Sequence, residues 1–340
     1  MKRERGLFDE EFRLRKISAQ GDPLEKLNQR VDWEIFRVTL TNVFKKEPNG
    51  PGGRPAYDYV MMFKILVLQR MYGLSDAQTQ YSILDRLSFM RFLGLELASD
   101  VPDEKTIWLF RETLSKSGAM RRLFKRFNSE MSKAGIMGNK GCVVDASIVD
   151  VPRQRNDRDE NDMIKNGEIP EEWTTKPAKL RQKDTDARWT KKNDEVHYGY
   201  KDHIKIDKDS KMIMEYEVTE ASVHDSQALN DLLKKEDEGK EIYGDSAYSG
   251  EPIAKTVEKR KMKNKIHEKG HRGRKLTKKQ KETNRRKSRI RARVEHVFGF
   301  MTNSMRGMFI RTIGKIRAAM TIGLMNLVYN IFRYMQLRMA

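Results

Sequence analysis

The hydrophobic pattern of this chain changes its period at Gly138. Before that residue apolar side chains recur every three or four positions, as in α-helices, whereas residues 140–150 alternate with Val144 and Ala146 on one face. Asp145 interrupts the other face in mid-strand, although aspartate is a poor strand former. The change predicts an all-α N-terminal domain over 1–137 and an α/β domain over 138–340. Because aspartate is unfavourable in the middle of a strand, Asp145 is also a candidate functional residue.

Capping signals divide the first 137 residues into helices. Asp58 can cap a helix over Tyr59–Tyr72, Gly73 can end it, and Ser75 with Gln78 has the spacing of a capping box. Two helices joined by a short turn with glycine are typical of a helix-turn-helix. The same pattern is typical of any αα-hairpin, so both a DNA-binding and a purely structural role remain open.

The sequence pattern of residues 138–340 predicts, in order, three strands, a helix, a strand, a helix, a strand and then further helices. The strands fall at 140–150, 197–206, 212–219, up to Asp245 and around 263–267, and two late helices at 284–301 and 314–336. Residues 153–195 are polar and predict a long loop. This order is the one expected of an RNase-H-like fold, with a mixed five-stranded sheet covered by helices.

Three acids occupy informative places in this order. Asp145 lies within the first strand, Asp245 follows the fourth, and Glu295 lies on a late helix. Taken alone, Asp245 is a common turn aspartate. In an RNase-H-like fold, however, the first and fourth strands are neighbours, so the two aspartates would meet and the helix would bring Glu295 to them.

Three converging carboxylates without a cationic partner repel one another unless divalent cations neutralise them. Ligation by oxygen alone suits Mg²⁺ or Mn²⁺. Two such ions about 4 Å apart can activate an attacking oxygen and stabilise a leaving oxygen in phosphoryl transfer.

The positive charge of the chain is concentrated in one segment. The 340 residues include 68 Lys or Arg and 49 Asp or Glu, a net charge of +19, and residues 259–293 carry 18 Lys or Arg but only two Glu. This basic arm predicts a polyanionic partner, nucleic acid before membrane. Because like charges repel, we expect the arm to stay unpacked until DNA neutralises it. The candidate DNA-binding residues in it are Lys278, Lys279, Lys281, Lys287 and Arg291. The alternative is a solvated basic surface.

Other candidates lie outside the arm. Trp189, between Arg188 and Lys191, suits stacking on an unpaired base beside phosphate contacts, but it can equally pack on its own domain. His224 can position DNA or cap a helix. The remaining histidines that we considered show no metal-ligand spacing and are predicted to be solvated surface residues: His203, His267, His271 and His296.

Several long motifs resemble the transposases of bacterial IS5-type insertion sequences. They are Gly53-Arg-Pro-Ala-Tyr-Asp58, Tyr72-Gly-Leu-Ser75, Leu84-Asp-Arg-Leu-Ser-Phe-Met-Arg-Phe-Leu-Gly94, Asp186-Ala-Arg-Trp-Thr-Lys-Lys192 and Arg289-Ile-Arg-Ala-Arg-Val-Glu-His-Val-Phe-Gly299. The resemblance runs over nearly the whole chain and implies a DDE transposase. Asp145, Asp245 and Glu295 would then be a catalytic triad that binds two Mg²⁺ or Mn²⁺ ions.

The resemblance also implies partners. These are the terminal inverted repeats of a mobile element, a target DNA, and further copies of the chain as a homodimer or higher oligomer in a synaptic complex. The broader IS4-like group has Tyr, Arg, Glu and Lys around the third acid. Arg291 and Glu295 fit that spacing here, whereas Ser288 and Thr302 stand in place of Tyr and Lys.

The sequence predicts a cytoplasmic, nucleoid-associated bacterial protein. Residues 1–6 carry no apolar signal region, the stretch from Met320 to Leu337 is interrupted by polar residues, and the single Cys142 excludes a disulfide framework or a Cys-rich zinc site. Two other functions were weighed. A catalytically silent DNA-binding protein derived from a transposase is the main alternative, and an RNA-binding protein is disfavoured because no ribonucleoprotein aromatic motif is present.

Overall fold

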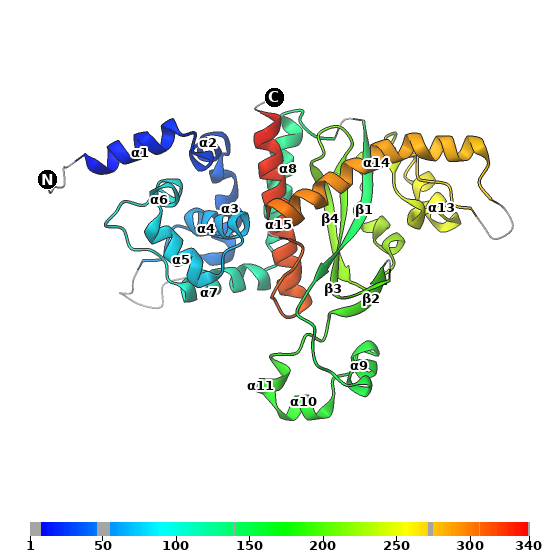
Figure 1. The fold of residues 1–340 in the computed structure, drawn as a ribbon, viewed down its shortest axis with the longest axis horizontal. Helices are drawn as coiled ribbons and strands as arrows, with labels where there is room; N and C mark the ends of the chain where they lie inside the picture. The colour runs from blue at the N-terminus through cyan, green and yellow to red at the C-terminus, as the bar shows by residue number, and fades with distance from the viewer. Residues whose placement is uncertain are drawn as a thin grey trace. The chain divides into compact units, whose positions relative to one another are not determined.

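A computed structural model of the chain describes residues 8–45, 55–138, 140–192, 194–270, 275–305 and 307–338. Contacts divide the chain into a helical unit, residues 1–127 with 338–340, and an α/β unit, residues 128–337 (Figure 1). Within the described ranges, no helix is long and apolar enough to cross a membrane.

The helical unit is built from short helices, several of which are capped by a side chain. They are α1 (Asp9–Ala19), α2 (Pro23–Arg30), the 3-10 helix η1 (Trp33–Phe36), α3 (Arg37–Phe44), α4 (Tyr59–Tyr72), α5 (Asp76–Asp85), α6 (Leu87–Leu93), α7 (Glu104–Lys116) and the start of α8 (Met120–Lys133). Asp58 caps α4, and Ser75 and Gln78 form a capping box at α5. Gly73 ends α4 at φ +61°, a left-handed conformation that glycine adopts without strain. The capping predictions are therefore confirmed.

Helix α4 is the centre of this unit, because every residue from Val60 to Leu68 is buried. One of them is charged. Lys64 is 8% exposed, and its ammonium lies 4.4 Å from the ring centroid of Phe92 and 5.6 Å from that of Trp33. Its nitrogen donates a 2.9 Å hydrogen bond to Asn28 Oδ1.

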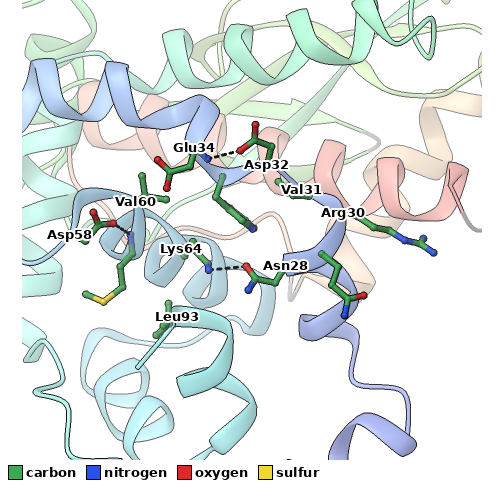
Figure 2. A pocket seen from close by; sticks show the side chains of 12 residues that line it. Asn28, Arg30, Val31, Asp32, Glu34, Asp58, Val60, Lys64 and Leu93 are labelled. Atoms are coloured by element: carbon green, nitrogen blue, oxygen red, sulfur yellow. Dashed lines mark hydrogen bonds between the residues drawn. The ribbon is translucent and has the colours of Figure 1, made fainter. Parts of the chain in front are cut away.

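Lys64 lies in the wall of a cavity of about 560 Å³ between α2, η1, α4 and the end of α6. Figure 2 shows Lys64 directed at Asn28, with Asp32, Glu34 and Asp58 around the same cavity. The carboxylates of Glu34 and Asp58 both accept from Arg37 and form no ion pair with Lys64. Burial lowers the pKa of Lys64 to about 8.

We expect Lys64 to make the stability of the chain depend on pH. Its pKa is lower in the folded protein than in the unfolded chain, so between about pH 8 and 10.5 the unfolded state binds more protons. The contribution of Lys64 to the free energy of unfolding should therefore rise with pH across that window. Urea denaturation of the wild type and of Lys64→Met at several pH values measures it. The contributions of other titrating groups cancel in the difference between the two free energies of unfolding. If the free energies of unfolding of both proteins changed with pH in parallel, the expectation would be wrong.

The α/β unit contains one mixed sheet. Its strands are β1 (Gly141–Asp150), β2 (Arg188–Lys192), β3 (Glu195–Asp207), β4 (Ile213–Glu220), β5 (Glu241–Tyr243) and β6 (Lys263–Asn264). The order is β2-β3-β1-β5-β6, with β4 also paired to β3. Strands β1, β2 and β4 each pair antiparallel with β3, whereas β5 pairs parallel with both β1 and β6.

Helices cover this sheet. They are η2 (Asp225–Ala228), α12 (Leu229–Leu232), η3 (Lys235–Asp237), η4 (Ser246–Tyr248), α13 (Glu251–Lys259), α14 (Lys278–Ser304) and α15 (Lys315–Leu337). Helices α12 and α13 pack with β5 and one face of β1 through a cluster that includes Val144, Leu232 and Ile242. Helix α14 packs on β1, and α15 packs on β3 and β4. The predicted RNase-H-like arrangement is confirmed, but the sheet has six strands, because β2 adds to the expected five.

The predicted loop over 153–195 is wrong for most of its length. It contains α9 (Arg158–Lys165), α10 (Glu171–Thr175), α11 (Pro177–Leu180) and β2, drawn in green beyond β1 in Figure 1. Two apolar side chains of this segment, Trp173 and Ile164, are buried and form its small core. Asp184 anchors the segment to β3 and to the start of α15. Its carboxylate accepts hydrogen bonds from the Tyr200 hydroxyl at 2.8 Å and from the Gly314 N–H at 3.1 Å.

The basic arm is also more ordered than expected. Its described residues include the end of α13, strand β6 and the first half of α14, which begins six residues before the predicted helix. Thr277 and Gln280 form a capping box there. The charges are accommodated because most of them point to water while Val294 is buried on the opposite side of the helix.

The division between the two units falls inside α8, ten residues before the predicted boundary at 137/138. The second half of α8 belongs to the α/β unit because Asn128 hydrogen-bonds there. Its amide donates to Ile213 O at 2.9 Å, and its Oδ1 accepts from Asn330 Nδ2 at 2.9 Å.

Candidate active site

The parallel pairing of β1 and β5 brings two of the predicted acids together. The last paired residues are Val143 and Tyr243, so Asp145 and Asp245 each lie two residues further along neighbouring strands and on the same face. Asp245 Oδ1 accepts from the Ala247 N–H at 2.8 Å, which caps η4 and orients the carboxylate. Asp245 lies beyond the carboxyl end of β5, where open α/β sheets form their sites, and Asp145 lies in the middle of β1.

Asp145 is largely buried, with 16% of its side chain exposed. Its pKa is raised to about 6, mainly by burial and also by the negative charge of Asp245. The Ala146 N–H, at 2.8 Å from Oδ1, and the guanidinium of Arg291 oppose this rise. A carboxylate in this position is stabilised by added positive charge.

Arg291 supplies positive charge between the acids, and this corrects the expectation of three carboxylates without a cationic partner. One guanidinium nitrogen donates to Asp145 Oδ2 at 3.2 Å and the other to Glu295 Oε1 at 2.6 Å. Arg291 and Glu295 both lie on α14, one helical turn apart, so their side chains share a face of that helix. Glu295 is linked to Asp145 through this arginine, and 55% of its side chain is exposed.

Among the residues that the structure describes, no group of three or more His, Cys, Asp or Glu side chains is arranged to hold a metal ion. The donor chemistry nevertheless fits a hard divalent cation, because Asp145, Asp245 and Glu295 offer oxygen ligands alone. Two of these side chains, Asp145 and Glu295, already pair with a cation, the guanidinium of Arg291. Asp145, Asp245 and Glu295 are the residues that would hold Mg²⁺ or Mn²⁺.

His267 was predicted to be a surface residue, but it lies beside this site. It follows β6, its N–H donates to Gly244 O at 3.1 Å, and its Nε2 is 3.4 Å from Ser288 Oγ on α14. Burial lowers its pKa, as do Arg291 and Lys287, whereas Asp245 raises it. No sequence signal marks it, since the parallel pairing of β5 and β6 brings it next to Gly244. His203 is likewise buried, not exposed, and contacts Thr219; His271 lies outside the described residues.

The predicted DNA-contact residues outside the arm are dispersed. Arg188 donates to three backbone carbonyls, of Thr185, Ala187 and Ile164, which favours a structural role. Trp189 lies on β2, 39% exposed, and its ring packs 4.8 Å from that of Tyr198. Lys191 pairs with Asp194 at 2.9 Å. His224 caps η2 by accepting from the Ser226 N–H, which is the capping alternative.

The basic residues of α14 differ in their surroundings. Lys287 is largely buried and donates to Ile266 O at 2.9 Å. Lys278, Lys279 and Lys281 are exposed. Helical spacing places Lys278 and Lys281 on one side together with two further exposed residues, Arg285 and Arg289. We call these four residues the α14 basic stripe, and within the described structure none of them forms an ion pair.

The sheet order, with one acid on β1, one after β5 and one on α14, defines an RNase-H-like domain with a carboxylate site. Residues 137–331 match the family "Transposase DDE domain", and residues 12–113 match the family "Transposase domain (DUF772)". The first match covers more than half of the chain, which therefore belongs to the transposase DDE domain family.

One solved structure is similar at the level of the whole chain. It is the cryo-EM structure of the piggyBac transposase synaptic complex with hairpin DNA, at 12% identity and a TM-score of 0.44, over 93% of this chain and 75% of that chain. This likeness is too weak to carry a conclusion about the present chain.

Proposed function

We propose that this protein is the DNA transposase of a bacterial insertion sequence of the IS5 type. It would bind the terminal inverted repeats, cleave DNA at the ends of the element and transfer the 3′-OH ends to target DNA. The observation that carries the proposal is the placement of Asp145 on β1 and of Asp245 just after the parallel strand β5, with Glu295 joined to Asp145 through Arg291.

In this proposal Asp145, Asp245 and Glu295 are the catalytic residues and hold two Mg²⁺ or Mn²⁺ ions. When bound, such ions activate the attacking oxygen and stabilise the leaving one. The chain itself places the carboxylates, because β1 and β5 fix the two aspartates and the Ala247 N–H orients Asp245. Arg291 keeps Glu295 beside Asp145 and presents a cation to the DNA backbone at the same point.

The other roles are distributed over the chain. The helical unit would supply sequence-specific contacts to the transposon ends, with the turn between α4 and α5 as a helix-turn-helix, and the α14 basic stripe would follow the phosphates. Trp189 would stack on an unpaired base. Synapsis of two ends would require at least a homodimer, and the substrate would place the protein with the nucleoid in the cytoplasm.

A nicking assay tests this function. The protein is incubated with supercoiled DNA that carries the element's ends, in Mg²⁺, in Mn²⁺ and in EDTA. We expect end-specific nicks with either metal and none in EDTA, and a lower nicking rate for Arg291→Gln. Specific binding without nicking in any metal would support the alternative, a catalytically silent DNA-binding protein derived from a transposase. Absence of both binding and nicking would contradict the proposal.

A further inference from the structure

A second cavity, of about 310 Å³, lies at the base of the α9–α11 segment. Three stretches of chain form it. They are residues 151–155, which follow β1, residues 182–184, which precede β2, and residues 311–313, which lie between α14 and α15. The cavity is therefore assembled from parts of the chain that are up to 162 positions apart.

Hydrogen bonds hold these three stretches in place. The Ile310 N–H donates to Asp150 O at 3.0 Å, and the Val151 N–H donates to Tyr198 O at 3.0 Å. Gln154 Nε2 donates to Gln182 O at 3.2 Å. The walls of the cavity are thus positioned without a ligand, a condition that lowers the entropic cost of binding one.

The cavity is strongly cationic. Four basic residues line it, Arg153, Arg155, Lys183 and Arg311, against a single acid, Asp184. The Asp184 carboxylate is buried and already occupied by its bonds to Tyr200, to the Gly314 N–H and to the N–H groups of residues 186 and 187. It therefore neutralises little of the positive charge at the mouth.

Two of the four cations are engaged by the protein, and two are available. Arg153 donates to Val196 O at 2.7 Å, and Lys183 donates to Arg155 O at 3.0 Å. The guanidinium groups of Arg155 and Arg311 are on exposed side chains and have no hydrogen bond or ion pair with any described residue. Guanidinium groups are suited to phosphate because their donors form a planar fork.

Unsatisfied polar atoms point to a missing partner in the same cavity. Thr312 Oγ1 and Gln154 Oε1 are both buried and have no hydrogen-bond partner in the described structure. A buried polar atom without a partner costs free energy that a ligand or a bound water recovers. The threonine hydroxyl can donate to an anionic oxygen, and the Gln154 oxygen can accept from a water bound with it.

We propose that this cavity binds a phosphate group of the DNA backbone. The proposal rests on the proposed DNA transposase function and adds to it a contact outside α14. Val151 lies six residues beyond Asp145 on one extended stretch, roughly 20 Å away. The bound phosphate would then lie roughly 20 Å from the reacting one, a few base pairs away along the DNA.

The test compares two double variants in the full-length protein. Arg155→Gln with Arg311→Gln removes the two available cations, neither of which supports the fold. Lys235→Gln with Lys240→Gln removes the same charge before β5, at the opposite end of the sheet. Binding to end DNA is measured over a range of salt concentrations. We expect the salt slope of log affinity to fall by about 0.9 for the cavity variant, as the loss of one phosphate contact requires, and to stay unchanged for the control.

A second measurement locates the contact. Single phosphates of the end DNA are replaced by neutral methylphosphonates. One replacement a few base pairs from the cleavage point should weaken binding by the wild type but not weaken the cavity variant further. Thermal melting in inorganic phosphate separates DNA phosphate from free phosphate as the source of the ligand.

The outcomes are distinct. If the wild type binds no DNA, the proposed function is wrong. If it binds DNA and the cavity variant keeps the wild-type slope, the cavity proposal is wrong while the function stands. If the slope is unchanged and inorganic phosphate stabilises the wild type but not the variant, the cavity takes free phosphate, which also overturns the DNA assignment.

Discussion

Replacement of Asp145 or Asp245 by Asn, or of Glu295 by Gln, is expected to abolish strand cleavage while leaving DNA binding largely intact. Each amide keeps the shape of the side chain but removes the negative charge that would hold a divalent cation. We expect each cleavage rate to fall by at least about a hundredfold, the scale of losing one electrostatic contact in a transition state. Affinity should change little, because one charge is small beside a net charge of +19. Single-turnover cleavage of end DNA and a binding titration in EDTA measure the two effects.

Asp150→Asn is the matched control for these variants. Asp150 ends the same strand as Asp145 but pairs with His197 at 3.2 Å, away from Asp245 and Glu295. The control should cleave at close to the wild-type rate. Binding of Mn²⁺ to the DNA-free protein gives a readout independent of activity, and it should weaken in the triad variants alone. A triad variant that cleaves normally would remove its residue from the proposed site.

The second large effect is expected from the α14 basic stripe. Changing Lys281 and Arg285 to Gln should lower the salt slope of log affinity for duplex DNA by about 1.8, because each lost phosphate contact removes about 0.9. Both side chains are exposed and free of ion pairs in the described structure. The measurement is a series of binding titrations between low and physiological salt.

Lys279→Gln with Arg286→Gln is the matched control on the same helix. These two substitutions remove the same amount of positive charge as the stripe variant. Helical spacing places Lys279 and Arg286 on another side of α14, and Arg286 already pairs with Glu282. We expect a slope close to that of the wild type. Equal slopes for the wild type and the stripe variant would mean that this face of α14 does not touch DNA. Equal losses in both double variants would indicate attraction by overall charge and not contacts along one face.

Local patterns in the sequence were sufficient for much of the architecture. The helix over Tyr59–Tyr72, the Ser75 capping box and the strand that contains Asp145 were all predicted from residues within a few positions of one another. Caps and periodicity are local because their hydrogen bonds and shared faces join near neighbours in the chain. The strand order of the sheet followed from the same element sequence, and with it the meeting of Asp145 and Asp245.

Features that depend on a few distant contacts were not predictable in this way. The segment after β1 was taken for a loop because its small core rests on Trp173 and on one buried carboxylate, Asp184. The basic arm was expected to be unpacked because charge counts do not show which side of a helix carries the charges. Here the apolar side is buried, so the helix forms while its charges remain in water.

Patterns in the sequence pointed to three candidate acids, to a helical and an α/β region, and to a basic late segment. The bridge of Arg291 between Asp145 and Glu295, the place of His267 beside the site, and the cavity shared by Arg155 and Arg311 are visible only in the folded chain. The physical reason is that side chains remote in sequence meet only after the strands have paired and the helices have packed. Their charges and hydrogen bonds then depend on distances that no local pattern contains.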